Sequence, residues 1–309
     1  MGRHKRILLS FPAAAMAVLL AAPAPAAPAQ EAPGGLIAFA SDRDGDAEIF
    51  VMNADGTDVR QITHNEVADH SPDWAPDGRR IVFVHETGDF NVDLHIVDTT
   101  TGEERVFTSW RNWYESDPAW SPDGRWIAFA SRHPDADGGD IEAVRIDRRR
   151  GRLIATQQEN STNVDPAWSP DGARLAFVEY YEAYDLFTTS FCCGHGFKRR
   201  TLTRDGATKL HPEWSPDGTR ILFSRYKAAG NHGLYTIDPN GGAETVVFEG
   251  ALDARSGTWS PDGGTIAFYA APPLGDSDIY LIDADGSGLT QLTDDPASDQ
   301  HPDWTPGPR

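Results

Sequence analysis

The sequence predicts an all-β protein, a six-bladed β-propeller with four antiparallel strands in each blade, because one phrase recurs along it at a nearly constant interval. Tryptophans stand at Trp74, Trp120, Trp168, Trp214, Trp259 and Trp304, at steps of 46, 48, 46, 45 and 45 residues. The first five open the pattern Trp-(Ala/Ser)-Pro-Asp-Gly, and the sixth opens Trp-Thr-Pro-Gly. A period of about 45 residues built from short strands is typical of propeller blades.

A run of β-forming residues follows each complete phrase, and this is the second observation behind the fold. The five runs are residues 81–84, 127–130, 175–178, 221–224 and 266–269, and a sixth copy, residues 36–40, precedes the first tryptophan. Within the phrase, proline presets φ for a turn and glycine accepts a left-handed backbone. We therefore expect a hairpin at each phrase, with Gly124, Gly172 and Gly218 in left-handed positions.

Two further strands complete each expected blade. Residues 48–53 and 278–283 have a third-strand pattern, and each segment runs into a second turn, Ala54-Asp55-Gly56 or Ala284-Asp285-Gly286. Residues 59–63, 200–203 and 289–293 predict fourth strands. Four short antiparallel strands in each repeat match the propeller pattern.

The order of these strands predicts how the ring closes. The repeat region begins with a second strand at Leu36 and ends with a first strand at residues 300–304. These two segments should complete one blade, which leaves no strand edge open at that point. The predicted organisation is a propeller over residues 36–304, preceded by a short flexible segment at 30–35 and followed by a tail at 305–309.

Residues 1–29 have the pattern of a secretory signal peptide. Arg3, Lys5 and Arg6 precede an apolar stretch over residues 7–22, and residues 27–29 (Ala-Pro-Ala) fit a cleavage site before Gln30. The alternative is a short membrane anchor, but Ser10 and Pro12 interrupt the stretch. We expect an exported protein that is periplasmic or secreted.

Charge and cysteine content narrow the function classes. The chain has 47 acidic and 27 basic residues and a net charge of −20, which disfavours nucleic acid and anionic membrane surfaces as partners. Its two cysteines, Cys192 and Cys193, are adjacent, so no disulfide framework holds the fold, and their redox state stays open. A metal site on this pair would need further ligands, although His195 is close.

One expected cluster of polar residues lies at a mouth of the central channel. The residues three positions before the tryptophans are Ser71, Asp117, Asp165, His211, Ser256 and His301. Two carboxylates and two imidazoles could bind a cation or act as acid and base, and the alternative is that they hydrate the channel mouth. If the protein is an enzyme, Asp117, Asp165, His211 and His301 are the expected catalytic residues.

The loops on the same face carry acids and aromatic rings. Residues 42–48 place acids at alternate positions, but the spacing departs from an EF-hand, and turn-forming acids in a solvated loop explain the pattern without a metal. Trp110, Trp113 and Tyr114 lie in one loop, and Tyr180, Tyr181 and Tyr184 lie in another. With Arg255, Lys209 or Arg132 beside them, such rings suit a peptide or a sugar, unless they pack between blades.

The recurring Trp-Ser-Pro-Asp-Gly-x-x-Ile-Ala-Phe phrase, the Asp-Ile-Tyr strand and the Ala-Asp-Gly turn resemble the TolB-type, WD-like propeller repeat. The resemblance covers residues 36–304 and implies the six-bladed fold. Prolyl-oligopeptidase-type enzymes carry related propellers, but no Gly-x-Ser-x-Gly elbow occurs in this sequence.

The function expected from these patterns is a non-catalytic scaffold that binds a protein or peptide over the channel-mouth face. The binding residues are expected to be Trp110, Trp113, Tyr114, Asp117, Asp165, His211, Arg255 and His301. The alternative is a glycan-active enzyme, a metal-assisted lyase or a hydrolase, with its site at the channel mouth. We expect a monomer without a cofactor and without stable membrane insertion; binding of calcium or another divalent ion stays open.

Overall fold

The computed structural model describes residues 34–88, 92–110, 113–136, 138–147, 152–154, 161–181, 183–191, 199–226, 230 and 232–306. The predicted signal peptide and the segment with Cys192, Cys193 and His195 lie outside these residues. Within them the chain forms strands β1 to β24 and no helix. Accordingly, no helix in the described segments has the length and hydrophobicity needed to cross a bilayer.

The first sheet joins segments from the two ends of the described chain, in the order β24-β1-β2-β3. Its strands are β1 (Leu36–Ser41), β2 (Glu48–Asn53), β3 (Arg60–Gln61) and β24 (Asp299–Trp304). β24 lies antiparallel to β1, with Ile37 opposite Trp304 and Ser41 opposite Asp299. The pairing follows from the strand order of the repeat, because β1, β2 and β3 are the second, third and fourth strands of a repeat and β24 supplies its first strand.

The next eight strands form one sheet made of two antiparallel sets. The first set is β4 (Asp69–Trp74), β5 (Arg80–Glu86), β6 (Val92–Asp98) and β7 (Glu104–Val106), and the second is β8 (Tyr114–Trp120), β9 (Trp126–Arg132), β10 (Asp140–Arg145) and β11 (Arg152–Ile154). A single parallel residue pair, Val92 with Tyr114, joins the sets. Each set therefore has the same internal order as the four-stranded sheets.

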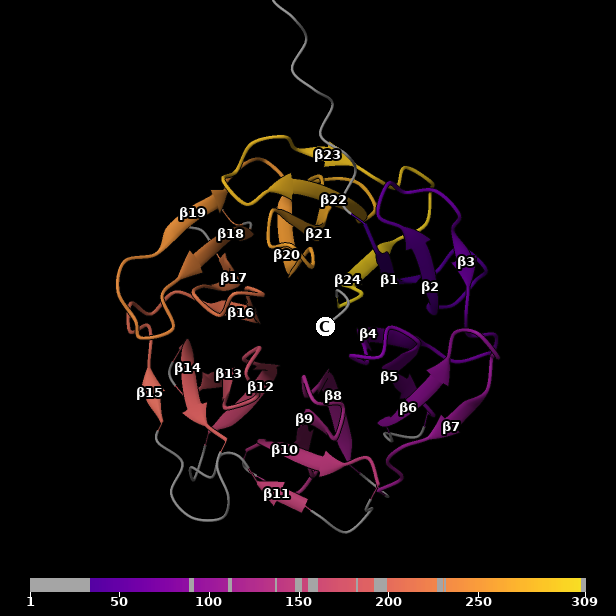
Figure 1. Ribbon diagram of the computed structural model, residues 1–309, viewed down its shortest axis with the longest axis horizontal. Coiled ribbons are helices and arrows are strands. Elements are labelled where there is room, and N and C mark those ends of the chain that lie inside the picture. The colour runs from indigo at the N-terminus through magenta and orange to yellow at the C-terminus, as the bar shows by residue number, and fades with distance from the viewer. Residues whose placement is uncertain are drawn as a thin grey trace, which may run out of the picture. The chain divides into compact units, whose positions relative to one another are not determined.

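Three four-stranded antiparallel sheets follow along the chain. They are β12 (Thr162–Trp168), β13 (Arg174–Tyr180), β14 (Tyr184–Ser190) and β15 (Arg200–Thr201); β16 (Lys209–Trp214), β17 (Ile221–Tyr226), β18 (His232–Ile237) and β19 (Thr245–Phe248); and β20 (Asp253–Trp259), β21 (Thr265–Ala271), β22 (Asp278–Asp283) and β23 (Thr290–Gln291). Figure 1 shows these sheets arranged around a common centre. β4, β8, β12, β16, β20 and β24 lie nearest to that centre, and we call them the inner strands.

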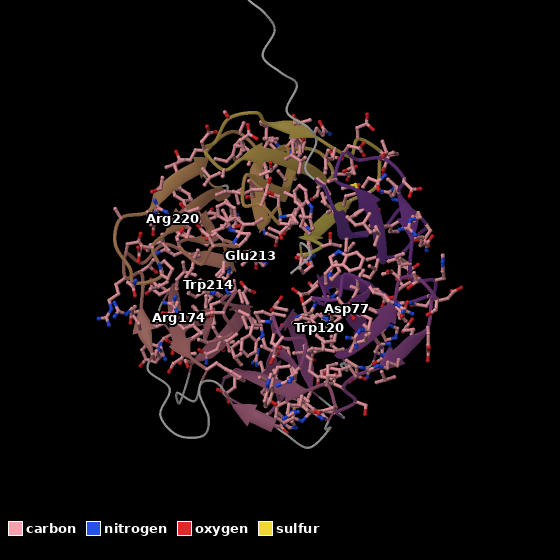
Figure 2. The ribbon with its side chains drawn as sticks, viewed as in Figure 1. Asp77, Trp120, Arg174, Glu213, Trp214 and Arg220 are labelled. Atoms are coloured by element: carbon pink, nitrogen blue, oxygen red, sulfur yellow. The ribbon has the colours of Figure 1, made fainter. Side chains whose placement is uncertain are left out.

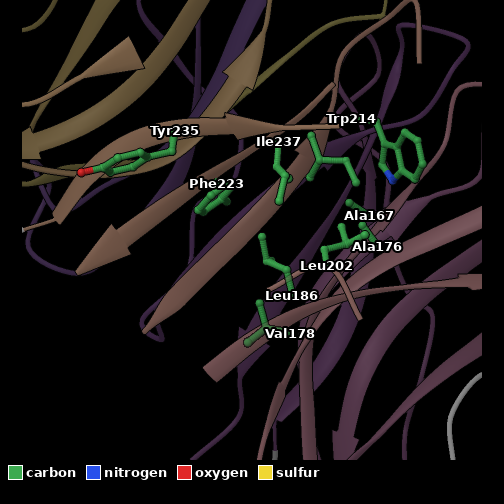
Figure 3. Packing of buried hydrophobic residues seen from close by; sticks show 10 residues of the cluster. Ala167, Ala176, Val178, Leu186, Leu202, Trp214, Phe223, Tyr235 and Ile237 are labelled. Atoms are coloured by element: carbon green, nitrogen blue, oxygen red, sulfur yellow. The ribbon is translucent and has the colours of Figure 1, made fainter. Parts of the chain in front are cut away.

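The hydrophobic core lies between neighbouring sheets. Six clusters of buried side chains each combine residues from two adjacent four-stranded sets. In one of them Val178 and Leu186 of one sheet pack with Phe223 and Trp214 of the next (Figure 3). Because each sheet is apolar on both faces, every strand depends on the sheet before it and the sheet after it.

The hairpin turns have the predicted geometry. Gly124, Gly172 and Gly218 have φ of 68°, 68° and 70°, which confirms their left-handed positions. In the turn after Trp120, the carboxylate of Asp123 accepts hydrogen bonds from Ser121 Oγ at 2.7 Å and from the N–H of Arg125 at 3.0 Å. Each residue type of the phrase therefore has a role in the turn itself.

The outermost strands are shorter than predicted. Regular strand pairing covers only Arg60–Gln61, Arg200–Thr201 and Thr290–Gln291. Beyond these residues a threonine hydroxyl, and not a backbone carbonyl, accepts a hydrogen bond from the neighbouring strand. Thr63 Oγ1 accepts the N–H of Ile49 at 2.9 Å, and Thr108, Thr203 and Thr293 make the equivalent bond. A short edge strand also offers little surface for unwanted strand addition.

Candidate functional site at the channel mouth

Each inner strand has a β-bulge three residues before its tryptophan. The bulged residues adopt a left-handed backbone: Ser71 (φ 51°), Asp117 (52°), Asp165 (54°), His211 (51°), Ser256 (43°) and His301 (50°). The register of every inner strand shifts at this point. A bulge re-aims side chains that would otherwise alternate between the two faces of a strand.

The six bulged residues, which we call the mouth ring, line one cavity of about 120 Å³. Sequence analysis expected them to meet, and the structure brings all six together. A cavity of this volume can admit a side chain or a chain terminus of a partner. His70, the residue before Ser71, forms a hydrogen bond with Ser71 Oγ, which lies 3.1 Å from His70 Nδ1.

Two mouth-ring carboxyls form a coupled pair. Burial raises the pKa of Asp117 to about 6, and the charge of Asp165 adds to this rise. Burial also raises the pKa of Asp165 to about 6, although hydrogen bonds from the His211 N–H, at 2.7 Å, and from Asp117 oppose it. Ser116 Oγ donates to Asp117 at 2.7 Å. The pair can therefore hold a proton near neutral pH or neutralise a cationic group.

The imidazoles of the mouth ring are neutral at pH 7. Burial lowers the pKa of His301 to about 3, with the nearby charges of His211, His70 and Arg255 contributing. Burial likewise lowers the pKa of His211. Nδ1 of each ring and Oγ of Ser256 are buried without a hydrogen-bond partner within the described chain. Unsatisfied buried polar atoms cost free energy, so these three atoms favour a ligand group or water in the cavity.

A second layer of acids lies below the mouth ring, and sequence analysis missed it. Asp73, Glu213 and Asp303 each stand directly before a repeat tryptophan, and all three line the same cavity. Burial raises the pKa of Asp303 to about 7, and burial together with the charge of Asp303 raises the pKa of Asp73 and of Glu213 well above the usual range. The signal was present in the sequence, because alanine or threonine fills this position in the other three repeats.

Some acids of this second layer also connect adjacent sheets. Asp303 accepts the N–H of Trp74 at 2.6 Å, and Asp73 accepts the N–H of Trp120 at 2.7 Å. Glu213 has no such bond to a neighbouring sheet among the hydrogen bonds of the described chain, and Figure 2 shows it near the common centre. Burial and the charge of Asp303 raise the pKa of Glu213, so its carboxyl favours the protonated form.

The opposite end of the channel is built from repeated residues. A cavity of about 450 Å³ there is lined by all six repeat tryptophans and by Pro76, Pro122, Pro170, Pro216, Pro261 and Pro306. Asp73, Glu213 and Asp303 line this cavity as well as the cavity at the mouth. Arg80 stacks on Trp120 with its Cζ 5.0 Å from the ring centre, and Asp77, labelled beside Trp120 in Figure 2, accepts from Arg80 Nε at 2.8 Å. This end repeats the same chemistry around the centre.

A cleft lies beside the mouth ring. It has a volume of about 550 Å³ and is lined by Tyr114, Ser116, Ala130, Ser131, Arg132, Pro134, Gly139, Thr162, Asn163 and Val164. Ser116, which bonds Asp117, forms the inner part of this lining, so the cleft begins at the mouth ring. Arg132 and Tyr114 give the cleft a cation and an aromatic ring.

Some of the predicted aromatic anchors pack against other side chains, and others are exposed to solvent. Trp110 packs on Phe129 at 5.5 Å, and Trp113 meets Trp110 at 6.0 Å and His133 at 5.4 Å. Trp110 is therefore partly structural, because its ring packs against the core cluster that joins β4–β7 to β8–β11. Tyr181 is 60 % exposed, and Tyr180 stacks on Tyr184 at 4.6 Å.

The predicted cations are largely paired. Arg255 Nη2 donates a hydrogen bond to Asp253 Oδ2 at 2.7 Å, and the Arg255 side chain is 37 % exposed. Lys209 is fully buried and forms ion pairs with Asp205 and Asp185, so the expectation that it lies beside exposed rings is wrong. The repeat pattern did not predict a buried lysine, because the equivalent position holds Asp69, Glu115, Asn163, Ala254 or Asp299 in the other repeats.

The acidic loop at residues 42–48 does not gather its carboxylates. Asp42 accepts the N–H of Ser298 at 2.8 Å, Asp44 contacts Gln61, and Glu48 is buried against Thr63 and Asn65. Within the described residues, neither this loop nor the mouth ring brings three ligand atoms within 4.8 Å of one another. Turn formation and sheet-to-sheet bonding account for these acids.

Comparisons with known proteins agree with this architecture. The family model described as the TolB beta propeller domain matches residues 24–162, 152–272 and 194–309. TolB from Acinetobacter baumannii superposes with a TM-score of 0.75 at 20 % identity, over 88 % of this chain and 67 % of that one. A search among curated proteins gives no match.

Two further solved structures share the fold. A chain of a nidogen/laminin complex has a TM-score of 0.69 at 14 % identity, covering 88 % of this chain and 98 % of that one. Oligogalacturonate lyase in complex with manganese has a TM-score of 0.59 at 16 % identity, covering 84 % and 73 %. At these identities the likeness establishes the fold alone. With the family model matching along the described strands, the chain belongs to the TolB β-propeller domain family.

Proposed function

We propose that this protein is a non-catalytic scaffold that binds a protein or peptide over the channel-mouth face, with a cationic group of the partner entering the mouth ring. The observation that carries the proposal is the mouth ring itself. Its cavity of about 120 Å³ combines a carboxyl pair with three buried polar atoms that have no partner in the described chain. A lysine or arginine side chain, or a chain amino terminus, would supply the missing charge and hydrogen bonds.

The cleft beside the ring supports a peptide over an isolated small cation. Tyr114 and Arg132 extend the lined surface outward from Ser116 and Asp117, so a segment anchored in the ring could continue along the cleft. Aromatic and arginine side chains are common anchors in interfaces. Propellers of this shape also occur in protein assemblies, as in the nidogen/laminin complex.

The architecture assumed in this proposal is a closed ring of six blades. The antiparallel pairing of β24 with β1 supports closure, as do the six core clusters, each of which joins two neighbouring sets of strands. Residues 1–29 support export, so the partner is expected in the periplasm or outside the cell.

A second candidate function is a glycan-active enzyme at the same mouth. The observation that favours it is the coupled Asp117 and Asp165 pair, since carboxyls with a pKa of about 6 suit acid–base chemistry near neutral pH. A lyase bound to manganese shares the fold. Release of unsaturated products from oligogalacturonate, with and without manganese, tests this candidate, and loss of that activity in D117N and D165N would establish it.

Selection of peptides from a random displayed library tests the binding proposal. We expect peptides enriched on the wild-type protein to share a lysine or arginine at one position. Acetylating that lysine should weaken binding at least tenfold, because it removes the charge that the carboxyl pair neutralises. Enriched peptides without a shared cation, or with equal affinity after acetylation, would contradict the proposed mode of binding.

A further inference from the structure

A second cluster of ligand-type side chains lies away from the channel, on the three outer strands of the set β4 to β7. His85 of β5, His95 of β6 and Glu104 of β7 each place one ligand atom within 4.8 Å of the others. In the described part of the chain this is the only such group of three or more. The two imidazole rings stack with their centres 4.1 Å apart and their planes 19° apart.

Each of the two imidazole rings forms a hydrogen bond with a carboxylate through its Nδ1 atom. His85 Nδ1 lies 2.6 Å from Asp69 Oδ1, and His95 Nδ1 lies 2.6 Å from Glu104 Oε1. Within the described residues, Nε2 of each ring is left without a hydrogen-bond partner. For His85 this is the usual arrangement of a metal-binding histidine, because Asp69 fixes the tautomer and leaves Nε2 available. His95 Nδ1 and Glu104 Oε1 face each other instead, so an ion bound by both would replace the proton that joins them.

The carboxylate behind His85 is itself fixed. Asp69 is fully buried and accepts a hydrogen bond from Asn65 Nδ2 at 2.7 Å, and the N–H of Asn65 donates to Glu48 at 2.5 Å. Glu48 belongs to β2 and Asn65 lies in the loop between β3 and β4, so the chain of contacts connects two sheets through this loop. Such a chain holds the His85 ring in place more firmly than a surface pair would.

We propose that His85, His95 and Glu104 bind a divalent transition metal ion, with zinc as the fitting ion, and that Asp69 positions His85. Two imidazole nitrogens and one carboxylate oxygen form a donor set that zinc accepts, with a fourth position left for water. Metal bonds of about 2.0–2.1 Å need donors about 3.3 Å apart, so the three side chains must draw together. Glu104 lies on an edge strand with 34 % of its side chain exposed, which gives it room to move and gives the ion an entry path.

Imidazole and carboxylate ligands must be deprotonated to bind a metal ion, so zinc affinity should fall at low pH. Calcium and magnesium prefer oxygen donors and should not compete at equal concentration.

Zinc titration calorimetry of the purified protein tests the proposal, in a C192S/C193S background that removes the thiols. We expect one zinc ion per chain, and at least tenfold weaker binding in E104Q and in H85N. E104Q is the variant least apt to disturb folding, because Glu104 lies on the exposed edge strand. E103Q, which changes the adjacent exposed glutamate, is the matched control and should bind zinc like the parent protein.

Two more variants locate the ion and the role of Asp69. H301N removes an imidazole from the mouth ring and should leave the zinc affinity unchanged. D69N should weaken binding about tenfold and alter its pH profile, as loss of an outer partner does. Absence of zinc binding, equal binding by E104Q, H85N and the parent protein, or loss of binding in H301N alone would each overturn the proposal.

Discussion

The two ends of the central channel are formed by the same inner strands but carry different side chains. At one end the six repeat tryptophans and the prolines that follow them repeat around the centre, and Asp73, Glu213 and Asp303 separate this lining from the mouth. At the other end the mouth ring has one backbone geometry, with φ between 43° and 54° at all six positions, but its side chains are serine, aspartate and histidine. The repeated backbone is therefore structural, and the variation that could define a ligand is confined to the side chains.

Burial has opposite consequences at these two ends. Tryptophan and proline gain free energy when they leave water, so the uniform end contributes to stability. Buried acids and unpartnered imidazole nitrogens cost free energy, so the mouth ring reduces stability unless something compensates it. We interpret this cost as the mark of a binding surface, since strain and unsatisfied groups gather at functional sites.

The largest effect should come from breaking the sheet that unites the chain ends. Deleting residues 298–309 removes β24, including Trp304, which is 3 % exposed, and its pairing with β1. Both channel ends then lose one of their six walls, and we expect loss of cooperative thermal unfolding. Deleting only residues 307–309 is the control and should leave the melting curve unchanged; equal melting of both deletions would refute ring closure.

The next largest effect is a pH-dependent change in the free energy of unfolding, which is expected at the mouth and not at the uniform end. Burial raises the pKa of Asp117 and Asp165 to about 6, above the value of an unfolded aspartate. The folded protein therefore holds these protons more tightly, so their contribution to stability is present below about pH 4 and is lost as the pH rises through about 6. D117N/D165N should gain about 1–3 kcal/mol over the wild type at pH 8 and little at pH 4.

Urea unfolding at the two pH values measures this difference, with S71A as a control in the same ring. His301 works in the opposite direction, because burial lowers its pKa to about 3 and its contribution is lost as the pH falls through the range below 6.5. Comparing each variant with the wild type at one pH cancels that contribution. A pH profile of D117N/D165N parallel to that of the wild type would show that the pair is not buried as described.

A smaller effect is expected at the turns of the uniform end. Replacing Gly124, Gly172 or Gly218 with valine should cost roughly 1 kcal/mol or more, because each glycine has a left-handed backbone. At Gly124 a Cβ would also meet Pro76 Cγ at 3.2 Å, whereas at Gly172 the nearest atom is 3.9 Å away. G124V should therefore be the less stable of the two in thermal melts, and G34A, where a Cβ meets nothing within 4 Å, should be neutral.

The sequence predicted the strand order, the turns and the six mouth-ring positions, since each is written into the repeat. It did not predict what depends on contacts between sheets. The cluster of His85, His95 and Glu104 comes from three different strands, and the burial of Lys209 depends on Asp205 and Asp185. The acids Asp73, Glu213 and Asp303 could have been found by comparing the residue before each tryptophan across repeats.

The aromatic anchors illustrate the same limit. Trp110 and Trp113 were expected as binding residues, yet their rings lie against Phe129, His133 and each other. A single sequence does not distinguish an aromatic side chain that packs on the core from one that is free to bind a partner. Tyr114, which lines the cleft beside the mouth ring, remains the aromatic residue best placed for binding.

The most direct measurement compares carboxylates at the two ends of the channel. A lysine-containing peptide selected on the wild-type protein is titrated calorimetrically into D165N and D117N, which alter the mouth ring. The matched controls are D171N and D123N, which remove the same charge from the hairpin turns at the uniform end. We predict at least tenfold weaker binding, about 1.4 kcal/mol, for the mouth variants and unchanged affinity for the turn variants. Unchanged affinity in the mouth variants, or loss in the turn variants alone, would contradict binding at the channel mouth.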